Sequence, residues 1–136
     1  MEQAAFKLDS YQFRKAFLDF DIPQNATLEI DLNPKGTFYA KTSQFELVFD
    51  VLIGCVETKS EMINVSCVAK FTFQGHISID EIPDYFYPNS LAILFPYVRA
   101  FVSTMSLQAN INPIVLPTIN LMGITETLRQ NTKVVQ

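Results

Sequence analysis

Hydrophobic and polar residues alternate along much of the N-terminal half of the chain. Every odd-numbered residue from Phe45 to Cys55 is apolar, whereas Glu46 and Asp50 lie on the opposite parity, and residues 62–74 repeat this period of two. Such alternation is typical of strands that bury one face. The polar residues between the two segments predict a hairpin. Keeping both apolar sets on one face requires an odd number of loop residues, most simply residues 58–60.

Two further strands are predicted upstream of this hairpin. Residues 5–23 are strand-like, but their apolar parity changes between Leu8 and Tyr11, which predicts a bulge or bend there. Residues 27–32 form a shorter alternating segment, and the sequence NPKG at 33–36 has the composition of a turn. Because the connections are short, the four strands are predicted to form an antiparallel sheet.

After Asp84 the apolar residues follow the period of a helix. Asn89 or Ser90 is the expected cap, and Pro96 predicts a kink or a restart one turn into the helix. Spaced prolines then predict an extended linker, residues 119–131 a short helix weakened by Gly123, and residues 132–136 a frayed tail. One stripe of the long helix consists of Leu91, Leu94, Phe95, Val98, Phe101, Val102 and Met105.

Charge is distributed unevenly between the two parts of the chain. Thirteen of the fourteen acidic residues lie between Glu2 and Asp84, and Arg99 is the single charged residue in 85–125. A helix that covers a sheet in a monomer would carry charge on its other side. The bare far side therefore predicts a second partner, most simply another copy of the helix, and the stripe is assigned to an oligomer interface. Arg99 is expected either to pair across that interface or to bond nearby carbonyls.

Length and composition limit the protein class. With 136 residues, 49% of them hydrophobic, the chain is expected to form a single α+β domain, with the sheet in 1–84 and the helical part in 85–136. The net charge of −4 and the scattered Lys and Arg residues argue against nucleic-acid binding. Prolines interrupt the apolar region before the roughly 20 residues that a membrane-spanning helix needs. The N-terminus has no apolar signal region, so a cytoplasmic location is expected.

Catalytic and metal-binding patterns find little support in the sequence. His76 is the single histidine, which leaves too few preferred ligands for zinc. Cys55 and Cys67 lie in strand-like runs and are expected to be buried free thiols, although a loop shifted toward Glu61 would bring them opposite each other. No enzyme activity and no cofactor are expected.

The C-terminal part resembles a known family. YPNSLAILFPYVRAFVSTMSLQANINPIVLPTINL is similar to the region of SecB export chaperones in which a Pro-Asn pair leads into a Leu-Phe-Pro-Tyr-x-Arg segment and spaced prolines precede a second helix. The matching positions are Pro88, Asn89, Leu94, Phe95, Pro96, Tyr97, Arg99, Met105, Pro113 and Pro117. Four antiparallel strands followed by two helices is that family's order of elements.

The resemblance implies a function and an assembly. SecB-like proteins are tetramers, arranged as dimers of dimers, that hold unfolded polypeptides in apolar grooves without ATP and pass secretory precursors to the SecA motor. The residues expected to line a groove are Phe20, Ile22, Leu28, Ile30, Leu121, Met122, Ile124 and Leu128. The acidic residues expected to dock a partner are Asp19, Asp21, Glu46 and Asp50.

Three departures from the family pattern leave alternatives open. The loop IPQNATL is short, Phe17 and the segment 67–69 stand where acidic residues would be expected, and the C-terminus RQNTKVVQ is basic. These changes are expected to affect SecA docking more than the holding of apolar clients. A chaperone of one dedicated client, such as an antitoxin, is therefore a second hypothesis, and a carrier of a small apolar ligand is a third.

Overall fold

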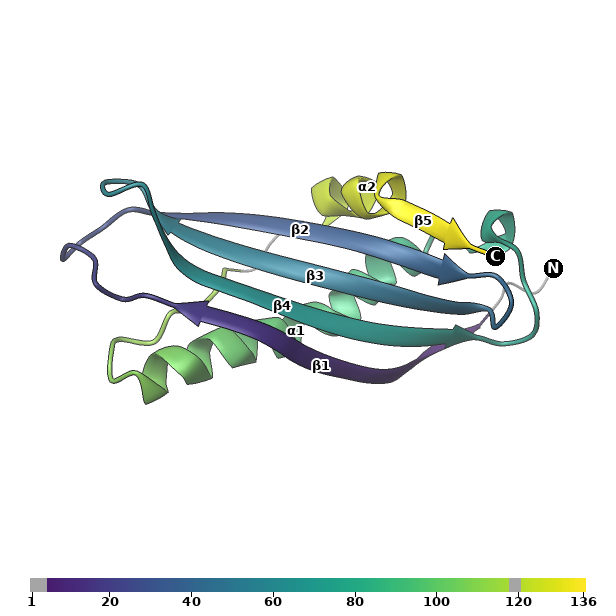
Figure 1. Cartoon of the computed structure of the whole chain (residues 1–136), viewed down its shortest axis with the longest axis horizontal. Helices are drawn as coiled ribbons and strands as arrows, with labels where there is room; N and C mark the ends of the chain where they lie inside the picture. Colours follow the sequence, from purple (N-terminus) through teal and green to yellow (C-terminus); the bar gives the residue numbers. More distant parts are fainter. Residues whose placement is uncertain (1–4, 118–120) are drawn as a thin grey trace.

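The computed structural model of the chain describes residues 5–117 and 121–136. In this part of the chain a single sheet lies against one long helix, and a short helix packs beside the sheet (Figure 1). The elements in chain order are β1 (Phe6–Leu18), β2 (Leu28–Tyr39), β3 (Gln44–Cys55), β4 (Ser60–Phe73), the 3-10 helix η1 (Ile79–Glu81), α1 (Phe86–Gln108), α2 (Met122–Gln130) and β5 (Thr132–Val135).

The sheet has five strands in the order β1-β4-β3-β2-β5. The first four are antiparallel, and β5 pairs in parallel with β2. The predicted α+β class is confirmed, but the prediction of a four-stranded, purely antiparallel sheet is wrong. The tail that was expected to fray forms β5, because α2 ends beside the edge of β2 and delivers the chain to its unpaired backbone groups. The Gly36 N–H donates to the Asn131 carbonyl at 3.1 Å.

The predicted turn at 33–36 lies inside β2. Pro34 stands opposite Phe49, and the chain turns at residues 40–43. A proline is tolerated here because its nitrogen points to the outer edge of the sheet, as the amide of Gly36 does two residues later. Gly36 is required by packing: a Cβ there would lie 2.2 Å from the ring of Phe45. The composition of residues 33–36 is that of a turn, but these residues are extended because β2 pairs with β3 along its whole length.

The hairpin of β3 and β4 confirms the predicted parity but not the register. A loop of residues 58–60 would pair Cys55 with Ile63, whereas Ile53 lies opposite Ile63 and Cys55 lies opposite Ser60. A bulge after Ile53 leaves Met62 as an extra, buried residue. Cys67 pairs with Phe49, so the two cysteines are not opposite each other, and both are free thiols.

Bulges in β1 restore the facing of its side chains. One lies between Leu8 and Ser10, where the parity change predicted it, and a second lies between Phe13 and Lys15. Each inserts a residue that has no partner on β4, and the apolar residues on both sides of it then point to the core. The prediction of a bulge near Leu8 is confirmed.

The helix α1 is continuous for 23 residues with Pro96 inside it. It begins at Phe86, before the predicted caps, and no side chain caps its start. By length and composition α1 is long and apolar enough to cross a membrane, so the argument that prolines interrupt the region is wrong. A helix packed on a sheet passes the same test, and Leu91, Leu94 and Val98 of α1 are fully buried in the core.

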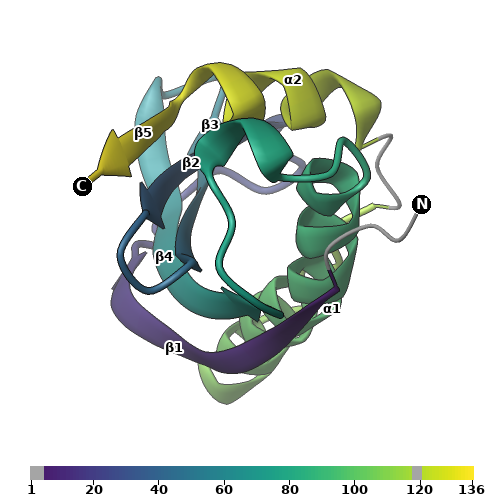
Figure 2. The ribbon, with the colours of Figure 1, turned by 90° about the vertical axis from the view of Figure 1, so that its right-hand side faces the viewer.

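The core lies between the inner face of the sheet and α1, as the end-on view in Figure 2 shows. Phe86 occupies its centre, with ring centroids 4.8 Å from those of both Phe45 and Phe73. The helix α2 is anchored separately. Its Leu128 is fully buried, and its Arg129 lies 2.8 Å from Asp84.

Candidate polypeptide-binding edge

The outer edge of β2 is only partly paired. The amides of Gly36 and Ala40 donate outward, to Asn131 and Val135. Since backbone groups alternate sides along a strand, the amides of the even-numbered residues upstream point to the same outer edge. Within 5–117 and 121–136, β5 pairs with residues 36–39, and no strand pairs with residues 28–35 on that side. We call residues 28–35 of β2 the open edge.

Two apolar side chains accompany the open edge. Leu28 and Ile30 stand opposite Cys55 and Ile53, whose side chains are buried, so all four lie on the core-facing side of the sheet. Yet Leu28 and Ile30 are 37% and 38% exposed. The core-facing side of the sheet is therefore uncovered where β2 begins. Exposed apolar side chains beside unpaired backbone groups are what an added strand requires.

The other predicted groove residues differ in exposure. Phe20, Ile22, Leu121 and Ile124 are half-buried and pack against the core. Met122, at the start of α2, is 78% exposed. Leu128 is fully buried, so its side chain supports α2 and does not face solvent.

The start of the open edge is fixed by a contact between two loops. Both carboxylate oxygens of Glu57 accept the Thr27 N–H at 2.9 Å, and these hydrogen bonds lower the pKa of Glu57. The Val56 N–H also donates to the Thr27 carbonyl. No sequence pattern indicates this pair, because Thr27 and Glu57 are thirty residues apart and meet only when β2 and β3 pair.

The four predicted acidic residues do not form one surface. Glu46 lies opposite Lys70, and Asp50 lies 3.9 Å from Lys35, so each has a cation beside it on the outer face of the sheet. Asp19 belongs to the loop after β1, where its N–H donates to the Met62 carbonyl. Along β4, Asp19 lies beside residue 62, Asp50 beside residue 66 and Glu46 beside residue 70. Four residues of a strand span roughly 13 Å, so successive acids are that far apart along the sheet. Asp21 lies in the same loop, with its N–H bonded to Asp19.

The predicted interface stripe of α1 faces the chain's own sheet. Leu91, Leu94, Phe95, Val98 and Val102 are buried, and Phe101 and Met105 are half-buried. The surface left for a second copy is the opposite side of α1, where Ile93, Tyr97 and Leu107 are 38%, 42% and 57% exposed. Arg99 is half-buried, and in the described part of the chain it forms no salt bridge.

An aromatic border joins α1 to β1. Tyr11 stacks on Tyr97 with ring centroids 4.3 Å apart, and Phe13 stacks on Phe101 at 4.1 Å. Tyr11 and Tyr97 remain 41% and 42% exposed. Sequence reasoning did not identify this border, because the pairing depends on the bulges that set the facing of β1.

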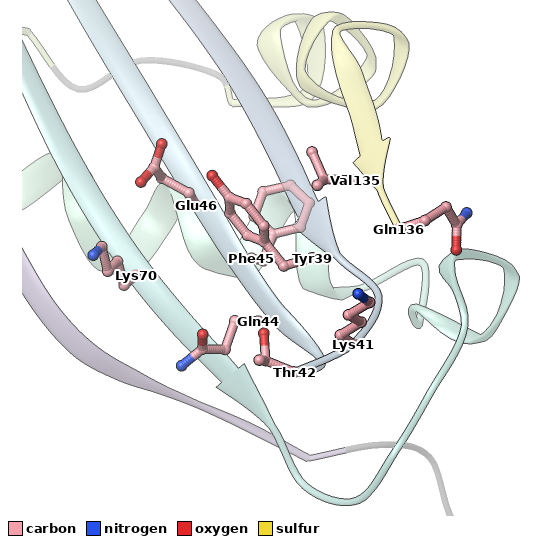
Figure 3. A pocket seen from close by; sticks show the side chains of 9 residues that line it. All are labelled: Tyr39, Lys41, Thr42, Gln44, Phe45, Glu46, Lys70, Val135 and Gln136. Atoms are coloured by element: carbon pink, nitrogen blue, oxygen red, sulfur yellow. The ribbon is translucent and has the colours of Figure 1, made fainter.

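A hollow of about 360 Å³ lies on the other side of the molecule, where β2 and β5 end and β3 begins (Figure 3). Its walls include Tyr39, Lys41, Glu46 and Lys70, together with Val135 at the end of β5. Cations and an anion share this lining, so the hollow lacks the apolar character of a lipid-type cavity.

The fold matches that of a known chaperone. The SecB-like chaperone Rv1957 of Mycobacterium tuberculosis, solved with a ChAD peptide from the HigA1 antitoxin, superimposes with a TM-score of 0.68 over 85% of this chain and 88% of that one. The chain has a SecB-like fold. Sequence identity to Rv1957 is 13%. The comparison therefore supports the SecB resemblance at the level of fold.

Sequence comparison gives a shorter match. The uncharacterized protein MJ0357 of Methanocaldococcus jannaschii is 47% identical over 60 residues, which is 41% of this chain and 39% of that protein. The match thus spans well under half of the relative's length. No protein-family model matches the chain.

Proposed function

We propose that this chain is a chaperone that holds extended segments of unfolded polypeptide at the open edge of β2, without ATP. The observation that carries the proposal is the combination of unpaired, outward-pointing backbone groups at residues 28–35 with the exposed, core-facing side chains of Leu28 and Ile30. Backbone pairing does not depend on the client's sequence, and apolar contacts require only hydrophobic side chains at alternate positions. Such a site suits many unfolded segments.

The fold comparison supports a polypeptide client. Rv1957, which shares the SecB-like fold, was solved with a peptide bound to it. In this chain the residues proposed to contact the client are Leu28 and Ile30 at the edge, together with half-buried Phe20, Ile22, Leu121 and Ile124 and exposed Met122. Leu128 takes no part in that contact, because it is fully buried.

The proposal includes a homotetramer built through α1. Its outer side presents Ile93, Tyr97 and Leu107 with no carboxylate or lysine in the helix. A second copy of the same surface would bury these side chains, and about 25 cal/mol is gained for each Å² of apolar area removed from water. Arg99, which is half-buried, is proposed to pair with a group of the second copy.

The client is proposed to be a dedicated one rather than a secretory precursor delivered to SecA. SecA docking was expected from an acidic surface, but Glu46 and Asp50 have lysines beside them and Phe17 is 43% exposed on the outer face. Rv1957, the SecB-like protein of matching fold, was solved with an antitoxin peptide. Titration of the purified protein with a SecA tail peptide tests the export role. Tight binding would contradict the proposal of a dedicated client and favour delivery to SecA.

A carrier of a small apolar ligand is the weaker candidate. The hollow in Figure 3 has Lys41, Glu46 and Lys70 in its wall. An apolar molecule placed there would remove charged groups from water, which is costly.

The test of the chaperone proposal is aggregation of a reduced, unfolded model client followed by light scattering. Wild-type protein is expected to suppress aggregation near equimolar ratio, with no effect of added ATP. Ile30→Lys should abolish suppression, because it places a charge on the apolar side of the open edge. Phe17→Lys is the matched control, since Phe17 is a 43% exposed apolar residue of β1, on the far side of β4 and β3 from that edge. Equal suppression of aggregation by both variants would show that the client does not bind at the open edge.

A further inference from the structure

The strand β5 covers the part of the β2 edge that directly continues the open edge. It pairs Thr132 with Gly36 and Val135 with Tyr39, and the Ala40 N–H donates to the Val135 carbonyl at 2.9 Å. The chain's own tail therefore already forms the contact that is proposed for a client, namely an extended segment added to the outer edge of β2.

Few interactions hold β5 in place. None of its four residues is buried, and Val134 and Val135 are 37% and 41% exposed. Thr132, at its start, is half-buried and donates its hydroxyl to the Leu128 carbonyl at 2.7 Å, whereas the three residues after it are exposed. Parallel pairing of so short a strand gives it little stability of its own. At its far end Val135 and Gln136 line the open hollow in Figure 3, so no described element closes over the tail.

The helix before β5 is anchored independently of it. Leu128 is fully buried, the Arg129 guanidinium lies 2.8 Å from Asp84, and it also stacks over the Tyr87 ring at 4.7 Å. These contacts join α2 to the start of α1. Release of β5 would therefore leave α2 and the sheet of β1 to β4 in place.

We infer that β5 is a built-in competitor for the client, and that an extended client segment with apolar residues at alternate positions displaces it from residues 36–39. The inference rests on the proposed function and adds its regulation. In the closed form a client reaches only the eight residues of the open edge; with β5 released, pairing continues through Gly36, Phe38 and Ala40. The preference of this stretch for an apolar side chain is indicated by Val134, which stands opposite fully buried Phe38.

Backbone alternation identifies the variant that tests this competition. Asn131 and Val135 direct their carbonyls toward β2, so Lys133, between them on the same parity, directs its N–H toward β2 as well. Lys133→Pro removes that donor and disfavours the strand. Lys133→Ala is the matched control, because it removes the same charge and keeps the amide.

The probe is dye-labelled, reduced and carboxymethylated lactalbumin, and the first readout is its dissociation constant by fluorescence anisotropy. If β5 is closed in most molecules, the apparent affinity of the wild type is lowered by the fraction that is open. Lys133→Pro is then expected to bind about 3- to 10-fold more tightly than the wild type, with Lys133→Ala close to the wild type.

The second readout is amide hydrogen exchange of the wild type with and without the probe. Client binding is expected to remove protection from Lys133 and Val135 while Gly36 and Ala40 stay protected, since a client strand replaces β5 on β2. Binding with protection of Val135 unchanged, and with equal affinities for the three proteins, would overturn this inference and leave the proposed function standing. Absence of probe binding to all three would overturn both.

Discussion

The two sides of α1 both lack carboxylates and lysines, but their surroundings differ. On the inner side Leu91, Leu94 and Val98 are fully buried against the sheet, whereas Ile93 and Tyr97 on the outer side are 38% and 42% exposed. Neither side carries the lysines and glutamates that usually cover the solvent side of a helix. The comparison shows that absence of charge along a helix does not say which side the chain itself buries.

The difference between the sides separates folding from assembly. Removing the inner contacts should unfold the chain at any protein concentration, because they lie within one molecule. Removing the outer contacts should act through association, which depends on concentration. Substitutions on the two sides can therefore distinguish a helix needed only for the core from one that also joins copies.

The largest effect is expected for Leu94→Ala on the inner side. The side chain is fully buried, so the substitution removes apolar contacts and leaves a cavity. We expect the free energy of unfolding to fall by about 2–5 kcal/mol in urea titrations followed by circular dichroism. The matched variant Ile93→Ala, one residue away, should cost far less, and its cost should change with protein concentration. A concentration-independent loss of equal size in both would contradict the distinction between the sides.

The next effect is a change of mass in the double variant Ile93→Glu, Leu107→Glu. Two carboxylates placed on the outer side would face their counterparts in a second copy, where like charges repel each other and desolvation is costly. We expect light scattering to show a monomer with an unchanged circular dichroism spectrum. Gln108→Glu, at the exposed end of α1, should leave the assembly intact. An unchanged oligomer in the double variant would place the interface elsewhere.

An intermediate effect is expected for Phe101→Ala, at the border between the two sides. Its half-buried ring stacks on Phe13 with centroids 4.1 Å apart. Such a ring pair contributes about 0.5–1.5 kcal/mol beyond its buried area. We expect both the unfolding free energy and the oligomer mass to decrease, whereas Leu94→Ala and the double glutamate variant each change mainly one of them. Loss of one property alone would assign Phe101 to one side.

The smallest effect concerns the pH dependence of stability, which reports whether water reaches Cys67 in the sheet that α1 covers. Burial raises the pKa of the Cys67 thiol from its ordinary value of 9.0 to about 11. The unfolded chain therefore loses this proton at lower pH than the folded chain, and stability should fall as pH rises from about 9 to about 11. In Cys67→Ala that part of the pH dependence should disappear when denaturation curves are compared at each pH. Identical pH profiles for the two proteins would indicate that water reaches the thiol.

Side-chain parity was the part of the fold that the sequence predicted best. The inward residues of β3 and β4, the bulge near Leu8 and the helix stripe follow from local periodicity, which packing against one face imposes. Features that depend on distant partners were missed. NPKG has the composition of a turn, yet it pairs with β3, and residues 132–136 become a strand only because the edge of β2 lies beside them.

Candidate site residues were predicted less well than the fold, for the same reason. The sequence identifies Leu28 and Ile30 as apolar residues of a strand, but their exposure depends on how much of the core-facing side of β2 is covered by packing helices such as α2. Leu128 had the same apolar character and turned out to be core. The stripe from Leu91 to Val102 was selected correctly as apolar, although periodicity does not say which of two apolar sides meets the sheet.

The proline in the middle of the β2 edge limits how far the protein can polymerise. Pro34 has no N–H to offer at the edge, so a long partner strand meets a gap in the row of donors. A molecule that leaves a strand edge open for clients risks stacking on copies of itself into fibrils. The missing donor at Pro34 is expected to disfavour continuous cross-β growth along this edge. We expect Pro34→Val to shorten the lag time of thioflavin-positive fibril formation in concentrated solutions. An unchanged lag time would show that Pro34 does not protect the edge against fibril growth.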